Sequence, residues 1–477
     1  MEAAHTPDPH RWQALALVCV AFFMTILDVS IVNVALPSIK NSLHVSENSL
    51  QWVLIAYTIT FGGLLLLGGR AADLLGRRRM FMIGVALFAA ASLVCGLAGS
   101  IGVLIAARAV QGVGAAIVSP ATLAIITTTF EEGSERNKAL GIWGAMGGSG
   151  AAAGVLFGGI LTKYAGWEWI FFVNVPVGAA VLLLTRAVVR ESRISGLQGF
   201  DAAGAATITS SLALLVYAIS KAPQVGWASG RTIGLLIAAA VIFVAFVIIE
   251  RRHSEPIVPF RIFRVTTVLG ANVCGLFLGA VVFANFFLLT LYVQQVLGYS
   301  ALKTGLTFLA TAGTLIPVAG LSQALVTKLG VRPVLTVGLA LNTAGMIWYS
   351  QIPTHGSFAA HLLPGYLLVA FGMAFSFIPM SIAALAGVEP QEAGLASGLI
   401  NTSQQIGGAL GVAIASTVAF THMRTLLATG HSAAAAQTSG FALGFWVIAG
   451  ISAASVIACL ALVRGRELAP DALTAAG

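Results

Sequence analysis

Apolar stretches long enough to cross a lipid bilayer recur from one end of the sequence to the other. A hydrocarbon core about 30 Å thick needs about 20 apolar residues in a helix that rises 1.5 Å per residue. Of the 477 residues, 58% are hydrophobic and only 9% are charged, whereas an ordinary soluble domain has about 25% charged residues. This inventory cannot build a water-facing surface, so we expect an all-α membrane protein.

The hydropathy pattern predicts fourteen membrane-spanning helices, and an even number places both termini on the same side. The expected bounds are 12–36, 50–69, 80–99, 102–127, 139–162, 168–189, 202–221, 232–250, 266–296, 304–326, 333–351, 362–386, 394–420 and 441–463. With these bounds, 18 of the 25 lysines and arginines lie on the side of the N-terminus and 6 on the other side. The positive-inside rule therefore predicts cytoplasmic termini and a multi-pass protein of the inner membrane. This distribution accounts for the net charge of +8, so we expect no nucleic-acid partner.

A weak internal repeat relates the two ends of the chain. When Gly76 is aligned with Gly330, the loop ADLLGRRR matches VTKLGVRP, and Pro120 likewise pairs the fourth helix with the twelfth at Pro379. Repeats of this kind place a transport site near the bilayer midplane, between the two halves. The predicted units are a six-helix half (1–200), a two-helix insertion (201–264) and a second six-helix half (265–477).

The loop between the second and third predicted helices, GGRAADLLGRRRMF, begins at Gly68. Its glycines permit a tight turn and a close backbone approach, and its aspartate can accept hydrogen bonds from helix-terminal N–H groups or from arginines. We expect this loop to be a cytoplasmic latch between the halves. Alternatively, the loop serves only to fix the membrane topology and to cap the adjoining helices. The candidate gating residues are Gly69, Asp73, Gly76, Arg77, Arg78 and Arg79.

The spacing G-x-x-x-D-x-x-G-R-R-R in this loop resembles the signature loop of the major facilitator superfamily. ARAVQGVGAAIVSPA from Ala107 resembles the superfamily's fourth-helix motif. Three segments resemble the fourteen-helix drug:proton antiporter branch, the EmrB/QacA type: LDVSIVNVALPSI from Leu27, GWEWIFFVNVPVG from Gly166 and GLASGLINTSQQIGGALGVA from Gly394. The resemblance covers essentially the whole chain. It implies the major facilitator fold and proton-coupled export of small amphipathic compounds such as drugs, antibiotics and dyes.

The fifth predicted helix departs from the motif of that branch, G-P-x-x-G-G. The glycines Gly154, Gly158 and Gly159 are present, but Val155 replaces the proline. Small residues on one face let membrane helices pack closely, so these three glycines are candidate helix-packing residues. We expect no proline kink here.

Asp28 is the one acidic residue predicted to lie deep within a helix, and Arg108 is the one deep base. Counting from the outer helix ends places both about 9–12 Å below the outer boundary, so they can meet. A charge at this depth costs at least about 2.5–3.5 kcal/mol and usually marks function. Low dielectric favours the neutral carboxylic acid and a nearby arginine favours the carboxylate. Asp28 is therefore a candidate proton-binding site. A permanent structural ion pair is the alternative.

No nucleotide-binding pattern is present, because no Gly-Lys dipeptide occurs in the chain. The four cysteines lie singly in apolar runs, and the eight histidines fall in predicted termini or loops. We expect neither an enzyme nor a site for a metal, a cofactor or ATP. A proton gradient then remains as the source of energy, with protons and membrane lipid as partners.

The substrate cavity is predicted to be lined by polar and aromatic side chains from the facing helices, although interhelical hydrogen bonding is the alternative role for each amide. With a single deep carboxylate, the cavity favours neutral, anionic or monocationic amphipaths. A facilitator or proton symporter that imports a small metabolite is the alternative function. The candidates are Asn33, Tyr57, Asn272, Asn285, Gln294, Asn342, Asn401, Gln404 and Gln405.

Overall fold

The computed structural model describes residues 9–130, 134–193, 201–253, 256, 258, 260–386, 388 and 393–464, and their regular secondary structure is entirely helical. The elements are α1 (Arg11–Leu43), α2 (Glu47–Leu75), α3 (Arg77–Gly96), α4 (Ile101–Thr129), α5 (Ser134–Tyr164), α6 (Trp169–Phe172), α7 (Asn174–Val188), α8 (Ala202–Val225), α9 (Gly230–Arg252), η1 (Phe260–Arg264), α10 (Thr266–Leu291), η2 (Tyr292–Val296), α11 (Ala301–Leu329), α12 (Val331–Tyr349), η3 (Phe358–Leu362), α13 (Leu363–Ala384), α14 (Ala393–Ala428) and α15 (Ala433–Leu462).

Within the described residues, twelve helical segments are long and apolar enough to cross a membrane. Consecutive elements form one segment in three places: α6 with α7, α10 with η2, and η3 with α13. Helices α5 and α12 fall outside this set. Helix α5 is rich in glycine, whereas α12 has only 19 residues and includes Arg332 and Asn342. Both are nevertheless packed in the bundle, α5 against α1 and α11, and α12 against α13 and α15.

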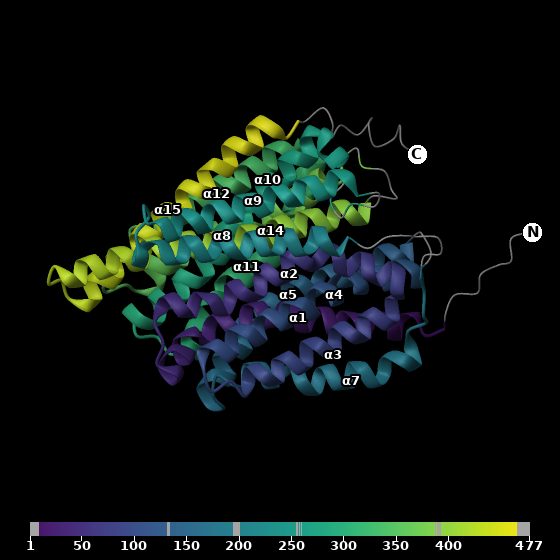
Figure 1. The fold of residues 1–477 in the computed structure, drawn as a ribbon, viewed down its shortest axis with the longest axis horizontal. Helices are drawn as coiled ribbons and strands as arrows, with labels where there is room; N and C mark the ends of the chain where they lie inside the picture. The colour runs from purple at the N-terminus through teal and green to yellow at the C-terminus, as the bar shows by residue number, and fades with distance from the viewer. Residues whose placement is uncertain are drawn as a thin grey trace, which may run out of the picture.

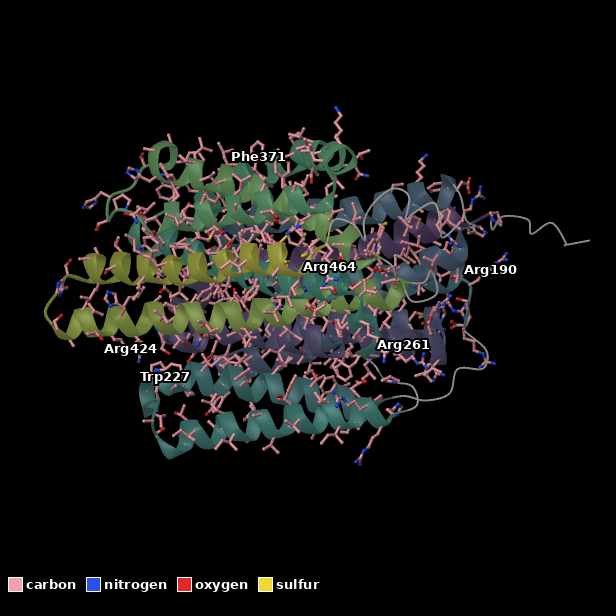
Figure 2. All side chains as sticks on the ribbon, turned by 90° about the horizontal axis from the view of Figure 1, so that it is seen from above. Arg190, Trp227, Arg261, Phe371, Arg424 and Arg464 are labelled. Carbon is pink, nitrogen blue, oxygen red and sulfur yellow. The ribbon has the colours of Figure 1, made fainter. Side chains whose placement is uncertain are left out.

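The long helices form two bundles that lie side by side (Figure 1). The N-terminal bundle comprises α1–α7 and the C-terminal bundle comprises α10–α15. They meet mainly where α2 packs on α14 and α5 packs on α11. Helices α8 and α9 pair with each other, and α8 contacts both α2 and α14. The α8–α9 pair therefore covers one of the two seams between the bundles, and in Figure 2 this pair, with Trp227 at its turn, lies along one long side of the molecule.

The loops matched by the internal repeat have the same local structure. Gly76 ends α2 and Gly330 ends α11, with φ values of +106° and +86°. Positive φ is accessible to glycine at little cost, and each glycine leads directly into the next helix. The matched prolines, Pro120 and Pro379, both lie inside helices.

The glycines of α5 lie at two tight helix contacts. A Cβ atom on Gly154 would lie 2.6 Å from the Leu27 carbonyl oxygen of α1, and one on Gly159 would lie 2.8 Å from the Leu302 Cα atom of α11. On the facing helix, a Cβ atom on Gly305 would lie 2.6 Å from the Val155 carbonyl oxygen. Helix α5 runs without interruption through Val155, in agreement with the missing proline. The α5–α11 seam therefore depends on small residues from both bundles.

The last two helices are longer than predicted and form a hairpin that projects at the end of the molecule opposite the chain termini (Figure 1). The good helix formers after residue 420 continue α14 to Ala428, and Gly430, with φ +89°, allows the turn. Ser432 caps α15, which begins in an alanine run.

The prediction that every histidine lies in a loop or a terminus is wrong. His422 lies in α14 and His361 lies in η3.

Candidate functional site

Asp28 of α1 and Arg108 of α4 form a salt bridge between the Asp28 Oδ2 and Arg108 Nη1 atoms, and both residues are fully buried. The contact agrees with their predicted depths. Arg108 also holds α2, because its Nε donates to the Val53 carbonyl oxygen at 3.1 Å. Its Nη1 donates to Gln111 Oε1 at 2.7 Å. One guanidinium group thus ties together three helices of the N-terminal bundle.

The second carboxylate oxygen of Asp28 accepts hydrogen bonds from two amides. Gln111 Nε2 lies 2.8 Å from Oδ1, and Asn174 Nδ2 of α7 lies 3.2 Å from it. Both amide nitrogens also contact Ser92 Oγ of α3, at 3.1 and 3.0 Å. Ser92 itself donates to the Phe171 carbonyl oxygen. The buried carboxylate is therefore held by polar groups from α4 and α7 and by an ordered second layer on α3.

Two aromatic rings flank the guanidinium group. The centroid of the Tyr57 ring is 4.3 Å from the Arg108 Cζ atom, and that of Phe171 is 5.8 Å away. Both distances lie within the range of cation–π attraction, which is stronger in a site shielded from water. The Tyr57 hydroxyl is buried with no hydrogen-bond partner in the described part of the chain. Tyr57, predicted to line the substrate cavity, therefore packs on the ion pair through its ring.

Three members of this network were not among the predicted site residues. Gln111 follows Arg108 by three positions, which places the two side chains on one face of α4. Asn174 lies in the segment GWEWIFFVNVPVG that resembles the antiporter branch. The sequence positions of Gln111 and Asn174 could therefore have indicated that they belong to the site. The position of Ser92 could not, because a lone serine in an apolar run more often bonds to its own helix.

The loop between α2 and α3, predicted to be cytoplasmic, makes a compact set of contacts. Arg77 donates to Asp73 Oδ1 through Nη2 at 2.8 Å and through Nε at 3.0 Å. The carboxylate of Glu191, which follows α7, accepts from the backbone N–H groups of Arg78 and Arg79 at 3.0 and 3.1 Å. An anion at a helix N-terminus is favourable, and here it fixes the start of α3. These contacts all lie within the N-terminal bundle, so the latch between halves stays a prediction.

Two glycines of this loop are required by their surroundings. A Cβ atom on Gly76 would lie 2.8 Å from Glu191 Oε1, at a positive φ, and one on Gly69 would lie 3.3 Å from Pro120 Cβ. Gly76 therefore permits both the turn and the approach of the capping carboxylate. Gly69 allows α2 to lie close to α4.

The predicted substrate-lining amides do not converge on one cavity. Four of them donate to the carbonyl group four residues earlier in their own helix: Asn33, Asn272, Asn342 and Asn401. Gln294 bridges the bundles by donating to the Val34 carbonyl oxygen at 2.8 Å. The side-chain oxygens of Asn285 and Gln405 are buried without a partner among the described residues, and the backbone of Gln404 packs against Gly279. A substrate role for these residues stays a prediction.

Comparison with known proteins decides the family. The family model for the Major Facilitator Superfamily matches residues 18–412. This chain belongs to the Major Facilitator Superfamily. Membership implies a transporter rather than an enzyme, and with twelve candidate spans the chain is a multi-pass membrane protein.

The curated relatives of this major facilitator protein include drug-resistance and export proteins of bacteria. The chain is 38% identical over 482 residues to the puromycin resistance protein of Streptomyces alboniger, covering 98% of this chain and 94% of the relative. It is 38% identical to the cephamycin export protein of Amycolatopsis lactamdurans, covering 85% and 84% of the two chains. The bacterial source of these relatives implies the inner membrane.

Solved structures show the same fold. A bacterial homologue of the human lysosomal transporter Spinster, in an inward-facing and unoccupied conformation, matches with a TM-score of 0.68 at 17% identity, covering 98% of this chain and 100% of that one. An auto-inhibited peptide transporter of the POT family matches with a TM-score of 0.67 at 16% identity, covering 94% and 96%.

Removing one charge of the buried pair is expected to destabilise the protein. Arg108→Met leaves the Asp28 carboxylate buried without its guanidinium partner, a loss of about 3–5 kcal/mol. We expect a lower unfolding temperature for detergent-purified Arg108→Met in a gel-filtration assay, with partial recovery in Asp28→Asn/Arg108→Met. Arg424→Met, at an exposed arginine of α14, is the control. Equal stability of Arg108→Met and Arg424→Met would contradict a buried charge pair.

Proposed function

We propose that this transporter exports small amphipathic compounds, including antibiotics, across the inner membrane in exchange for protons. The observation that carries the proposal is the fully buried Asp28–Arg108 pair within the N-terminal bundle. Ionisable residues inside a membrane are costly and usually belong to ion or substrate pathways. The direction of transport is supported by relatives that are named for export and for resistance to antibiotics.

In this mechanism Asp28 is the proton-binding group and Arg108 controls its affinity for the proton. A guanidinium beside a carboxylate in general favours the ionised form, so this mechanism assigns the proton-free state to the arrangement in which Arg108 contacts Asp28. If rocking of the bundles moves Arg108 and Val53 away from α1 and admits water from the outside, Asp28 takes up a proton. Restoring the contact expels that proton toward the cytoplasm. Asn174 and Gln111 bond to the same oxygen of Asp28, so they position the carboxyl group in both conditions.

The fold alone does not decide the direction of transport. The names of the relatives favour export over import. A facilitator or proton symporter for a small metabolite would use the same pair. Everted vesicles separate the two functions. An exporter should accumulate puromycin or a dye when the lumen is acidified and should consume the proton gradient. A symporter should release a preloaded substrate together with protons.

We further propose that α5 and α12 also cross the membrane, which gives fourteen spans arranged as six, two and six, with both termini in the cytoplasm. Support comes from their packing between helices that are themselves candidate spans. The repeat also supports this arrangement, because its matched loops, at Gly76 and Gly330, would then both be cytoplasmic. The units would be 1–200, 201–264 and 265–477.

Cysteine labelling should show that α5 and α12 cross the membrane. The native cysteines are buried, so an impermeant maleimide should report on introduced ones. In intact cells we expect labelling of Lys163→Cys and Gln351→Cys, at the outer ends of the two helices. Lys138→Cys and Lys328→Cys, near the opposite ends, should react only after permeabilisation. Labelling of both members of either pair from the same side would rule out a crossing.

Asp28→Asn is expected to abolish export driven by a proton gradient, because an amide cannot exchange a proton. The assay is puromycin or dye uptake into everted vesicles, with the folded amount of each variant measured in parallel. Glu135→Gln, which likewise replaces a carboxylate by an amide but at the exposed start of α5, should retain transport close to that of the unmodified protein. Undiminished uphill transport by Asp28→Asn would exclude the proton role and leave a structural ion pair.

A further inference from the structure

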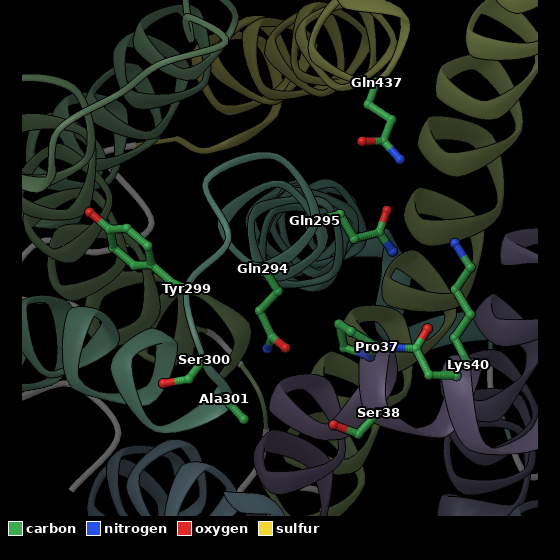
Figure 3. Close-up of a pocket in the computed structure, with 10 residues that line it drawn as sticks. Pro37, Ser38, Lys40, Gln294, Gln295, Tyr299, Ser300, Ala301 and Gln437 are labelled. Atoms are coloured by element: carbon green, nitrogen blue, oxygen red, sulfur yellow. The ribbon is translucent and has the colours of Figure 1, made fainter. Parts of the chain in front are cut away.

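A cavity of about 470 Å³ lies at the outer end of the molecule, where α1 approaches the C-terminal bundle (Figure 3). Helix α1 contributes Lys40 and Asn41, the turn η2 contributes Gln294 and Gln295, and α15 contributes Gln437. Among the predicted substrate residues, only Gln294 lines it. The cavity is far from apolar, because its wall is made chiefly of amides, hydroxyls and one ammonium group.

The local backbone explains why two neighbouring glutamines reach this space. Helix α10 ends in a π-helical turn, Tyr292–Val296, and such turns are wider than α-helical ones and often occur at functional sites. Gln294 donates to the Val34 carbonyl oxygen and closes the cavity against α1. The amide of Gln295 differs: within the described residues, its buried Nε2 and Oε1 atoms have no hydrogen-bond partner. A buried amide without partners is costly, so this wall is suited to a polar ligand.

The electrostatics of the cavity select the sign of that ligand. Lys40 is part of the wall, and Lys303 stands over the ring of the lining residue Tyr299, 3.5 Å from its centroid. Among the described residues, none of those that line the cavity is acidic. An adjoining cavity of about 270 Å³ shares Gln437 and includes Arg424. In Figure 3 the side chains of Lys40, Gln295 and Gln437 converge on the same space. A concave surface lined by charges of one sign concentrates ions of the opposite sign.

We propose that this cavity is an outer binding site for the anionic headgroup of an amphipathic molecule. Lys40 supplies the charge, and the amides of Gln295 and Gln437 supply hydrogen-bond donors to a carboxylate, sulfate or phosphate. The headgroup can belong to an exported compound that leaves the protein, which rests on the proposed function, or to an anionic phospholipid of the outer leaflet. Both sources share one recognition chemistry, and experiment can separate them.

Charge-selective cysteine labelling tests the site without requiring transport. In full-length protein in neutral phosphatidylcholine vesicles, Gln437→Cys should react faster with an anionic methanethiosulfonate than with a cationic one of similar size. We divide the labelling rate with the anionic reagent by the rate with the cationic reagent, and then divide this ratio by the same ratio for Ser100→Cys, on an exposed outer loop. We expect the normalised ratio for Gln437→Cys to be at least about three. In a protein that also carries Lys40→Gln, the normalised ratio should return to about one. Ser38→Cys, also in the wall, provides a second reporter if Gln437→Cys folds poorly. A ratio of one, or a cationic preference, at both reporters would overturn the proposal.

Protection of the same cysteine from an uncharged maleimide identifies the source of the headgroup. Slower labelling in neutral vesicles with added decanoate, but not with decyltrimethylammonium, assigns the site to a soluble amphipath. Slower labelling only after phosphatidylglycerol is included in the bilayer assigns it to lipid. Failure of every anion to protect, or equal protection by the cation, overturns an anion site. No proton gradient is involved, so this failure would leave the export proposal intact.

Discussion

The N-terminal bundle is organised around one charge pair, buried in the interior, where the free-energy cost of a charge is largest. Asp28 and Arg108 are both inaccessible to solvent, and removing two ions from water costs several kcal/mol for each ion unless the remaining hydrogen-bonding groups are satisfied. The protein meets this requirement with Gln111, Asn174 and the Val53 carbonyl group. Because these partners belong to α2, α4 and α7, the pair also fixes how those helices pack around α1.

The two bundles share the local structure of their matched loops but not this chemistry. In the repeat, Leu367 occupies the position of Arg108, and Thr327 occupies that of Asp73. Leu367 is half-exposed on α13, and Thr327 bonds to the Gln323 carbonyl group of its own helix. The C-terminal bundle instead contributes amides, such as Gln294, that reach across to α1. Proton exchange is therefore expected in the N-terminal bundle, while the seam with the C-terminal bundle would control access.

Much of this arrangement could be predicted from the sequence, because membrane insertion leaves few choices. Each expected helix coincides with an observed helix or with two consecutive elements, although several observed helices extend up to eight residues beyond the expected bounds. Counting residues from the expected helix ends was enough to place Asp28 and Arg108 at one depth. The amides were harder to assign. Asn33 and Asn342 could equally line a cavity or bond to their own backbone, and sequence pattern does not distinguish these. The cavity beside Lys40 was missed because Lys40 and Gln437 lie in parts of α1 and α15 beyond the predicted spans.

The central claim is that Asp28 exchanges a proton despite its arginine partner. Infrared difference spectroscopy of the protein in membranes, between acidic and alkaline buffers, observes this directly through the carbonyl stretch of a protonated carboxylic acid. The account predicts such a band in the unmodified protein and its loss in Asp28→Asn. Spectra in which the carboxylic acid region is identical for the two proteins would show that Asp28 neither gains nor loses a proton, and would contradict the account.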